Sequence, residues 1–113
     1  DEQNTNLSSK TLKKALAYID EHYTSENLSL GTVACEVQVG ANYLSSVFSQ
    51  NMQKTFTEYI SEKRMEKAKK LLKSTELPTS EIAAQVGYKD PHYFSFVFKK
   101  TQGCSPREYR SSI

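Results

Sequence analysis

The sequence predicts an all-α protein of about seven helices, arranged as two similar subdomains joined by a long linker helix. Three observations support this prediction. The 113 residues include only 4 glycines and 3 prolines, which is too few for a turn-rich sheet. Apolar residues recur at helical spacing along most of the chain. Finally, core and capping residues of the first half recur about 50 residues later, which indicates a tandem duplication.

The first half predicts three helices after a polar start. Residues 1–10 are expected to be a linker from a missing upstream domain, and the first subdomain is expected to span 11–54. From Thr11 an amphipathic stripe begins, with apolar residues at Leu12, Ala15, Leu16 and Ile19. Ser29 is a good N-cap for a short second helix. After Gly40 a third helix would turn three residues inward: Leu44, Val47 and Phe48.

The linker helix is expected to span 55–74. Thr55 and Glu58 form a capping box at its start. Its inner stripe is Phe56, Tyr59, Ile60, Ala68, Leu71 and Leu72. Arg64 falls on this apolar stripe. Because a buried arginine needs a partner, we expect Arg64 to form a structural ion pair.

The second subdomain, 75–113, repeats the pattern of the first. Thr79 or Ser80 is expected to cap a short helix that Gly87 closes. The last helix should begin with a second capping box, formed by Ser105 and Glu108. Each subdomain therefore has a short helix, a turn and a second helix, the layout of a helix-turn-helix. A generic αα-hairpin shares this layout.

The stretch DPHYFSFVFKK, residues 90–100, gives conflicting signals. Its aromatic and β-branched residues favour a strand, whereas Asp90 followed by Pro91 is a helix-start signature. The stretch also matches residues 40–50 of the first half, so we expect a helix that Gly103 closes. Its buried stripe is predicted to be Tyr93, Phe94, Val97 and Phe98.

Charge is distributed unevenly. Residues 1–53 carry three basic and six acidic side chains, whereas residues 54–113 carry twelve basic and seven acidic ones. This asymmetry suits a polyanion partner, and equally a solvated lysine-rich helix. The sequence shows no catalytic nucleophile–base pair, phosphate loop, metal cluster or cofactor motif. We therefore expect neither an enzyme nor a metal or cofactor site. No apolar run is long enough to span a membrane.

The second half resembles a known motif. SEIAAQVGYKDPHYFSFVFKKTQGCSPREYR, residues 80–110, is similar to the second helix-turn-helix of the AraC/XylS family of bacterial transcription regulators. The first half resembles the family's first motif, and the resemblance covers residues 11–111. It implies sequence-specific binding of double-stranded DNA, with the second helix of each motif in successive major grooves. The style of the VGYKDPHYFS segment is most similar to members fused behind a phosphoacceptor receiver domain.

The resemblance implies two sets of candidate DNA contacts. The base-contacting candidates are Asn42, Ser45, Ser46, His92, Ser95 and Phe96. The phosphate-contacting candidates are Ser49, Lys54, Lys99, Lys100, Arg107 and Arg110. Phe96 stands where the family commonly has an arginine, so we expect it to contact a thymine methyl group or a sugar. The alternatives are a solvated polar face, and a Phe96 that folds back onto the domain or covers a protein partner.

The resemblance also implies a setting for the domain. We expect a cytoplasmic regulator with an upstream sensor or receiver domain on the same polypeptide, and RNA polymerase is a further candidate partner. The alternative function is a helical protein–protein interaction module without DNA readout.

Overall fold

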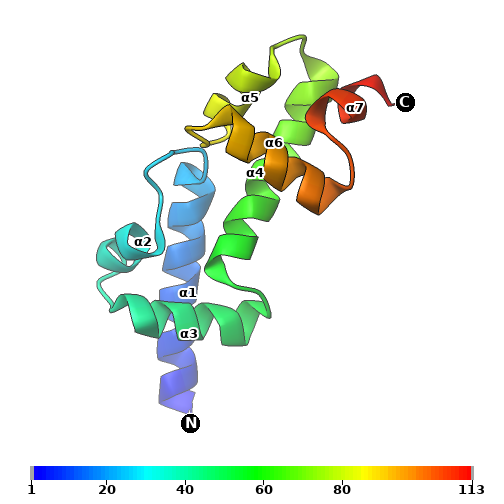
Figure 1. The fold of residues 1–113 in the computed structure, drawn as a ribbon. Coiled ribbons are helices and arrows are strands. Elements are labelled where there is room, and N and C mark those ends of the chain that lie inside the picture. The colour runs from blue at the N-terminus through cyan, green and yellow to red at the C-terminus, as the bar shows by residue number, and fades with distance from the viewer. Residues whose placement is uncertain (1, 113) are drawn as a thin grey trace. The chain divides into compact units, whose positions relative to one another are not determined.

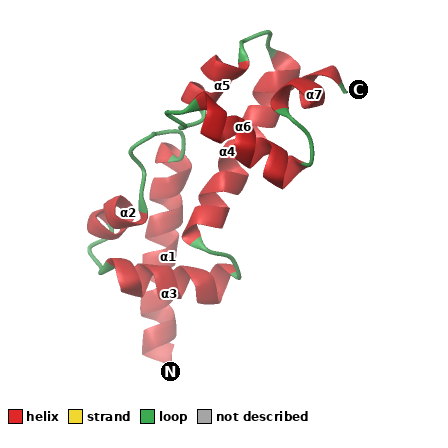
Figure 2. Cartoon of the chain, viewed as in Figure 1, coloured by secondary structure: helices red, strands yellow, loops and turns green. Residues whose placement is uncertain are grey.

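The computed structural model describes residues 2–112, with side chains from Ser9 onward. Over this range the chain forms seven α-helices and no strand (Figure 1 and Figure 2), as the sequence predicts. The helices are α1 (Glu2–His22), α2 (Leu30–Glu36), α3 (Ala41–Met52), α4 (Phe56–Ser74), α5 (Thr79–Gln85), α6 (Pro91–Gln102) and α7 (Pro106–Ser111).

The chain divides into two compact units. The first unit comprises the residues up to Tyr23 together with Leu28–Ser61, and the second comprises Thr24–Asn27 together with the chain from Glu62 onward. Helix α1 starts at Glu2, earlier than the expected start at Thr11, so residues 2–10 are helical. Helix α4 contributes residues to both units, since those up to Ser61 belong to the first and those from Glu62 to the second.

The first unit has its own hydrophobic core. Helices α2 and α3 pack against each other and against α1. Phe48 of α3 is fully buried, and its ring lies edge-on to Phe56 and Tyr59 of α4, with centroids 5.8 and 5.2 Å away. The remaining buried residues of this core are Ala15, Ile19, Val33, Ala34, Leu44 and Ile60. Because Leu44, Val47 and Phe48 are all buried as predicted, the opposite face of α3 is exposed.

The second unit has a separate core. It is built from Met65, Ala68, Leu72, Ile82, Ala83, Val86, Tyr88, Phe94 and Phe98. Within α6, Phe94 and Phe98 are fully buried and their ring centroids lie 5.9 Å apart. Phe98 also packs edge-on against Tyr109 of α7, at 5.7 Å. These two phenylalanines fix which face of α6 is turned away from the core.

The predicted inner stripe of α6 is wrong at Tyr93, which is 55% exposed. Phe94 and Phe98 are one helical turn apart and occupy the core. Tyr93 is rotated about 100° from Phe94 around the helix axis and so lies on the flank. Tyr88 takes the place against the core, with its ring centroid 5.6 Å from Phe94 and 6.0 Å from Tyr93.

Most predicted helix caps are confirmed. The Ser29 hydroxyl accepts a hydrogen bond from the Thr32 amide at 3.1 Å, and the Asp90 carboxylate accepts one from the His92 amide at 2.9 Å. The expected cap of α5 is wrong. Pro78 is the N-cap, and Thr79 already lies inside the helix. The extended conformation of Pro78 lets its carbonyl accept the first helical bonds, so no side chain closes this end.

The internal repeat extends to the backbone. Gln38 and Gly87, 49 residues apart, both have positive φ, at 64° and 107°. Gln53 and Gly103, 50 residues apart, also share this conformation, at 56° and 84°. L-residues adopt positive φ at a cost, which glycine avoids. The two copies therefore keep the same turn geometry even where one of them lacks glycine.

Arg64 of α4 has a structural role in the second unit. One of its terminal nitrogens donates to the Ser25 carbonyl at 2.9 Å, and its guanidinium carbon lies 5.0 Å from the centroid of the Tyr88 ring. A Cβ atom at Gly87 would lie 2.9 Å from Nε of Arg64. The arginine is therefore packed against the turn that leads into α6.

The two capping boxes make a pair of equivalent acid-sensitive sites. Glu58 accepts from the Thr55 amide at 2.8 Å, and Glu108 accepts from the Ser105 amide at 2.8 Å. These backbone hydrogen bonds, followed by those with the Thr55 and Ser105 side chains, lower the pKa of both carboxyl groups below 4.5. Because the folded pKa lies below the unfolded one, the boxes stabilise the fold above about pH 4.5, and this stabilisation is lost as pH falls through the folded pKa.

We therefore predict that the double variant Glu58→Gln and Glu108→Gln has a lower free energy of unfolding than the unaltered chain near pH 7. This difference should become smaller as pH falls, because the two carboxylates of the unaltered chain become protonated. Glutamine keeps the hydrogen bonds of a capping box but cannot titrate. Urea unfolding between about pH 7 and pH 3 measures the gap. Glu76→Gln, an exposed position outside the helices, is the control. A gap that stays constant with pH would contradict the prediction.

Candidate nucleic-acid interface

The outward face of α3 is polar and uncharged. Asn42, Ser46 and Ser49 are exposed, and Ser45 is half-buried. All four lie opposite the buried stripe of Leu44, Val47 and Phe48. Such a face offers hydrogen-bond donors and acceptors without positive charge.

The N-terminus of α3 differs from that of α6. Its N-cap is Gly40, which supplies no side-chain hydrogen bond to the first turn. In α6 the carboxylate of Asp90 fills this role. A helix N-terminus carries partial positive charge and amide donors that suit an anion. A phosphate at the N-terminus of α6 would face the Asp90 carboxylate. At the N-terminus of α3 it would face no such charge at the N-cap.

The outward face of α6 is mixed. His92, Phe96 and Lys99 are exposed and Ser95 is half-buried, with Phe96 60% exposed. The Lys100 ammonium lies 5.9 Å from the centroid of the Phe96 ring. The predicted candidates of this helix are therefore brought together on one surface, with two lysines in its last turn.

Two exposed tyrosines were missed as candidates for this interface. Tyr43 of α3 is 41% exposed and Tyr93 of α6 is 55% exposed, at equivalent positions of the repeat. The signal in the sequence was the residue type. A tyrosine beside leucine or phenylalanine has a polar tip that favours a place at the rim of a core.

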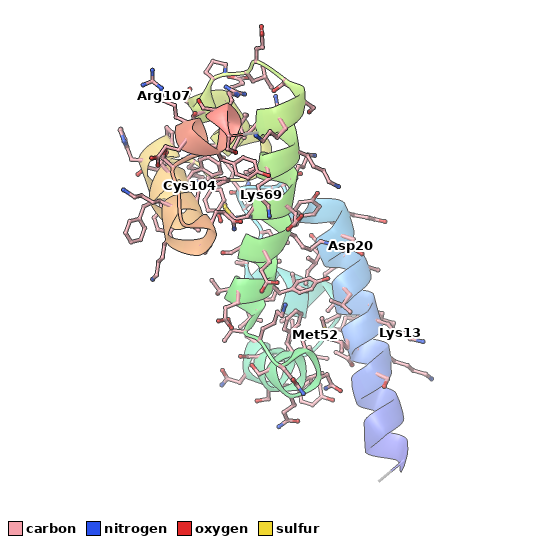
Figure 3. All side chains as sticks on the ribbon, turned by 90° about the vertical axis from the view of Figure 1, so that its right-hand side faces the viewer. Lys13, Asp20, Met52, Lys69, Cys104 and Arg107 are labelled. Atoms are coloured by element: carbon pink, nitrogen blue, oxygen red, sulfur yellow. The ribbon has the colours of Figure 1, made fainter. Side chains whose placement is uncertain are left out.

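The basic candidates differ in accessibility. Lys99, Lys100 and Arg107 are exposed, and Figure 3 shows Arg107 extending outward from α7. Lys54, just after α3, is half-buried. Arg110 is engaged elsewhere, because its Nε donates to the Leu72 carbonyl and a terminal nitrogen donates to the Thr75 carbonyl, both at 3.0 Å. These bonds cap the C-terminal end of α4.

Other classes of site find little support in the described part of the chain. Among the side chains described, those of residues 9–112, no group of three or more His, Cys, Asp or Glu is placed to hold a metal ion. Cys35 and Cys104 are free thiols. No helix in the described range is long and apolar enough to cross a membrane.

Comparison with known proteins shows which protein family this chain belongs to. A family model described as a helix-turn-helix domain matches residues 33–112, a range that includes the second helix of both motifs. The chain belongs to the AraC/XylS family of helix-turn-helix DNA-binding domains. This membership confirms the resemblance noted in the sequence. It makes the chain a DNA-binding domain of the kind found in bacterial transcription regulators, and not an enzyme.

Several AraC/XylS relatives and structures are closely similar to this chain. The arabinose operon regulatory protein of Escherichia coli is 34% identical over 100 residues, which cover 88% of this chain and 34% of that protein. The C-terminal domain of the two-component response regulator yesN from Fusobacterium nucleatum is 38% identical, with a TM-score of 0.87 over 90% of this chain and 99% of that one.

The C-terminal domain of AraT, a response regulator from Geobacillus stearothermophilus, is 44% identical, with a TM-score of 0.87 over 88% of this chain and 83% of that one. The chain spans about a third of the length of three curated transcription regulators that it matches.

Proposed function

We propose that this domain binds specific sequences of double-stranded DNA by placing α3 and α6 in successive major grooves. The observation that carries the proposal is that the second helix of both helix-turn-helix motifs has a buried apolar stripe that fixes an outward face, polar in α3 and mixed aromatic, polar and basic in α6. In helix-turn-helix proteins this second helix reads base edges in the major groove. Family membership supports the same assignment.

The base contacts are assigned to the outward stripes. Asn42 is placed to bond adenine through two hydrogen bonds, and Ser45, Ser46, His92 and Ser95 offer single hydrogen bonds. Phe96 has no hydrogen-bonding group. Its ring suits the methyl group of a thymine, the apolar feature of the major groove.

The phosphate contacts are assigned to groups around these stripes. They are the side chains of Ser49, Lys54, Lys99, Lys100 and Arg107, with the N-terminal amides of α3. Arg110 was a candidate from the sequence. We give it a lesser part, because two of its donors bond backbone carbonyls of the second unit.

The wider setting of the domain is also part of the proposal. The curated relatives are about three times longer than the matched region, and two similar structures are C-terminal domains of response regulators. These facts support an upstream receiver or sensor domain on the same polypeptide. A transcription regulator of this type would work in the cytoplasm, where RNA polymerase is a further partner.

Selection of bound sites from random double-stranded DNA tests the function. We expect a defined consensus, and a dissociation constant for the selected site about 10³-fold or more below that for unrelated DNA at the same salt concentration. If no DNA of any sequence is retained, the result would favour the alternative function, a protein-interaction module. Exposed Tyr93 and Phe96 would then form its contact surface.

The open N-terminus of α3 gives a sharper prediction. Gly40 has φ −72° and ψ 150°, and a Cβ atom there would meet nothing within 4 Å. Gly40→Asp should therefore stabilise the fold by a few tenths of a kcal/mol as an N-cap. At the same time it should weaken DNA binding by about 1 kcal/mol, since a carboxylate would face the phosphate.

Gly40→Asn is the matched control, because asparagine caps equally well without charge. Thermal unfolding and fluorescence anisotropy on the selected site measure the two effects. The affinity gap between the two variants should shrink as salt rises. Equal affinity of the two variants at low salt would remove this phosphate contact from the proposal.

A further inference from the structure

The exposed face of α6 carries a chain of aromatic and cationic contacts that ends at Phe96. It starts at the half-buried Arg64, whose guanidinium carbon lies 5.0 Å from the Tyr88 ring centroid. Tyr88, only 8% exposed, lies 6.0 Å from Tyr93. Tyr93 in turn stacks on Phe96, with centroids 6.4 Å apart and ring planes at 29°. Tyr93 therefore contacts a buried ring on one side and the exposed Phe96 ring on the other.

This chain explains how an exposed phenylalanine can have a defined position. Side chains in a helix lean back over the preceding turn, so the Phe96 ring lies over the turn that contains Tyr93. The ammonium of Lys100, one turn further on, lies 5.9 Å from the centroid of the Phe96 ring. Alone on a surface, a phenylalanine 60% exposed would move among its allowed rotamers. Contact with Tyr93 and Lys100 would restrict that movement.

We propose that Tyr93 is a specificity-determining positioning residue, which holds the Phe96 ring so that it reads the C5-methyl group of one thymine. The inference rests on the proposed function, because it assumes that α6 enters the major groove. Tyr93 would act through Phe96 and contribute to recognition of the methyl group only while Phe96 is present. A preorganised ring loses less freedom on binding, and a ring held at the position of the methyl group loses that contact when the methyl group is absent.

The repeat supplies a natural comparison. Tyr43 occupies the equivalent position of α3 and is also exposed. Three residues later α3 has Ser46 where α6 has Phe96. The tyrosine is thus present in both copies, whereas the ring that it would position is present only in the second. Methyl readout of this kind is therefore expected from α6 and not from α3.

Replacement of thymine by deoxyuridine tests the proposal, since it removes only the methyl group. Each thymine of the selected site is replaced in turn, and the ratio of affinities for the two DNAs is measured by competition. For the unaltered chain we expect a loss of about fourfold at one thymine, the value of one buried methyl group. Phe96→Ala should bring this ratio to about one.

Tyr93 is then tested by its own variants. Tyr93→Ala should reduce the methyl ratio close to one, Tyr93→Phe should keep it because the stacked ring remains, and Tyr43→Ala should leave it unchanged. The double variant Tyr93→Ala with Phe96→Ala should show no further change in the ratio. Circular dichroism and thermal unfolding check that each variant is folded, which the exposure of Tyr93 favours.

Three results would overturn the inference. One is a methyl ratio that Tyr93→Ala leaves intact, even if it weakens binding to both DNAs, since Tyr93 would then make a contact of its own. Another is a domain that binds its selected site without distinguishing deoxyuridine from thymine at any position. Both would leave the proposed function standing. Failure to bind any DNA would instead overturn the proposed function and this inference with it.

Discussion

Replacing Phe94 by alanine should lower the free energy of unfolding by about 3–5 kcal/mol. Phe94 is fully buried in the core of the second unit, and its ring centroid lies 5.6 Å from that of Tyr88 and 5.9 Å from that of Phe98. Removing its ring leaves a cavity in a core that α4, α5 and α6 build together, and those helices cannot close it without moving. A domain of this size has a free energy of unfolding of only about 5–15 kcal/mol. This single substitution would therefore remove a large part of it. Urea unfolding gives the value.

Phe96→Ala is the matched control for this prediction. It removes the same side chain from the same helix, but from a position that is 60% exposed. Surface substitutions usually change stability by about 0.5 kcal/mol or less. Similar losses for the two variants would mean that α6 is turned differently about its axis, and would remove the basis for assigning its outward face to DNA.

Raising the salt concentration from about 50 to 200 mM should weaken DNA binding on the order of 100-fold. Lys54, Lys99, Lys100 and Arg107 are the four basic side chains assigned to phosphates. Four released counterions correspond to a slope of about −3.6 in a plot of log affinity against log salt. Fluorescence anisotropy over this range of salt measures the slope.

Lys99→Ala should reduce the magnitude of that slope by about 0.9 and weaken binding to all sequences alike. Lys13→Ala is the control, since Lys13 is an exposed lysine of α1 that is not assigned to DNA (Figure 3). A slope near zero for the unaltered domain would contradict the assignment of these contacts. A loss confined to certain sequences would mean that Lys99 contacts a base instead.

Local signals in the sequence predicted most of the fold. Capping boxes at Thr55 and Ser105, the Asp90-Pro91 start and the apolar stripes were enough to place the helices. These signals act within one or two turns, so they can be read from neighbouring residues. They failed at Thr79, where Pro78 took the capping position, and at the start of α1, where the polar residues 2–10 carry no periodic apolar pattern.

The remaining features depend on contacts that are distant in the sequence. In the sequence Arg110 resembles the other basic candidates. In the structure its side chain donates hydrogen bonds to backbone carbonyls 38 and 35 residues away. Tyr93 belonged to an apolar run, yet Tyr88 decided its exposure by occupying the adjacent place in the core. Periodicity identifies the side of a helix that faces inward. It cannot tell which of two neighbouring rings will reach the core.

The division of the chain into units bears on how such domains can evolve and be engineered. The second unit includes Thr24–Asn27 from the first half of the sequence, and Arg64 bonds the Ser25 carbonyl there. Helix α4 supplies side chains to both cores. The two halves of the sequence therefore do not coincide with the two units, because residues 24–27 of the first half belong to the second unit. A chimaera that joins halves of two relatives would have to take residues 24–27 and α4, which includes Arg64, from the same parent protein.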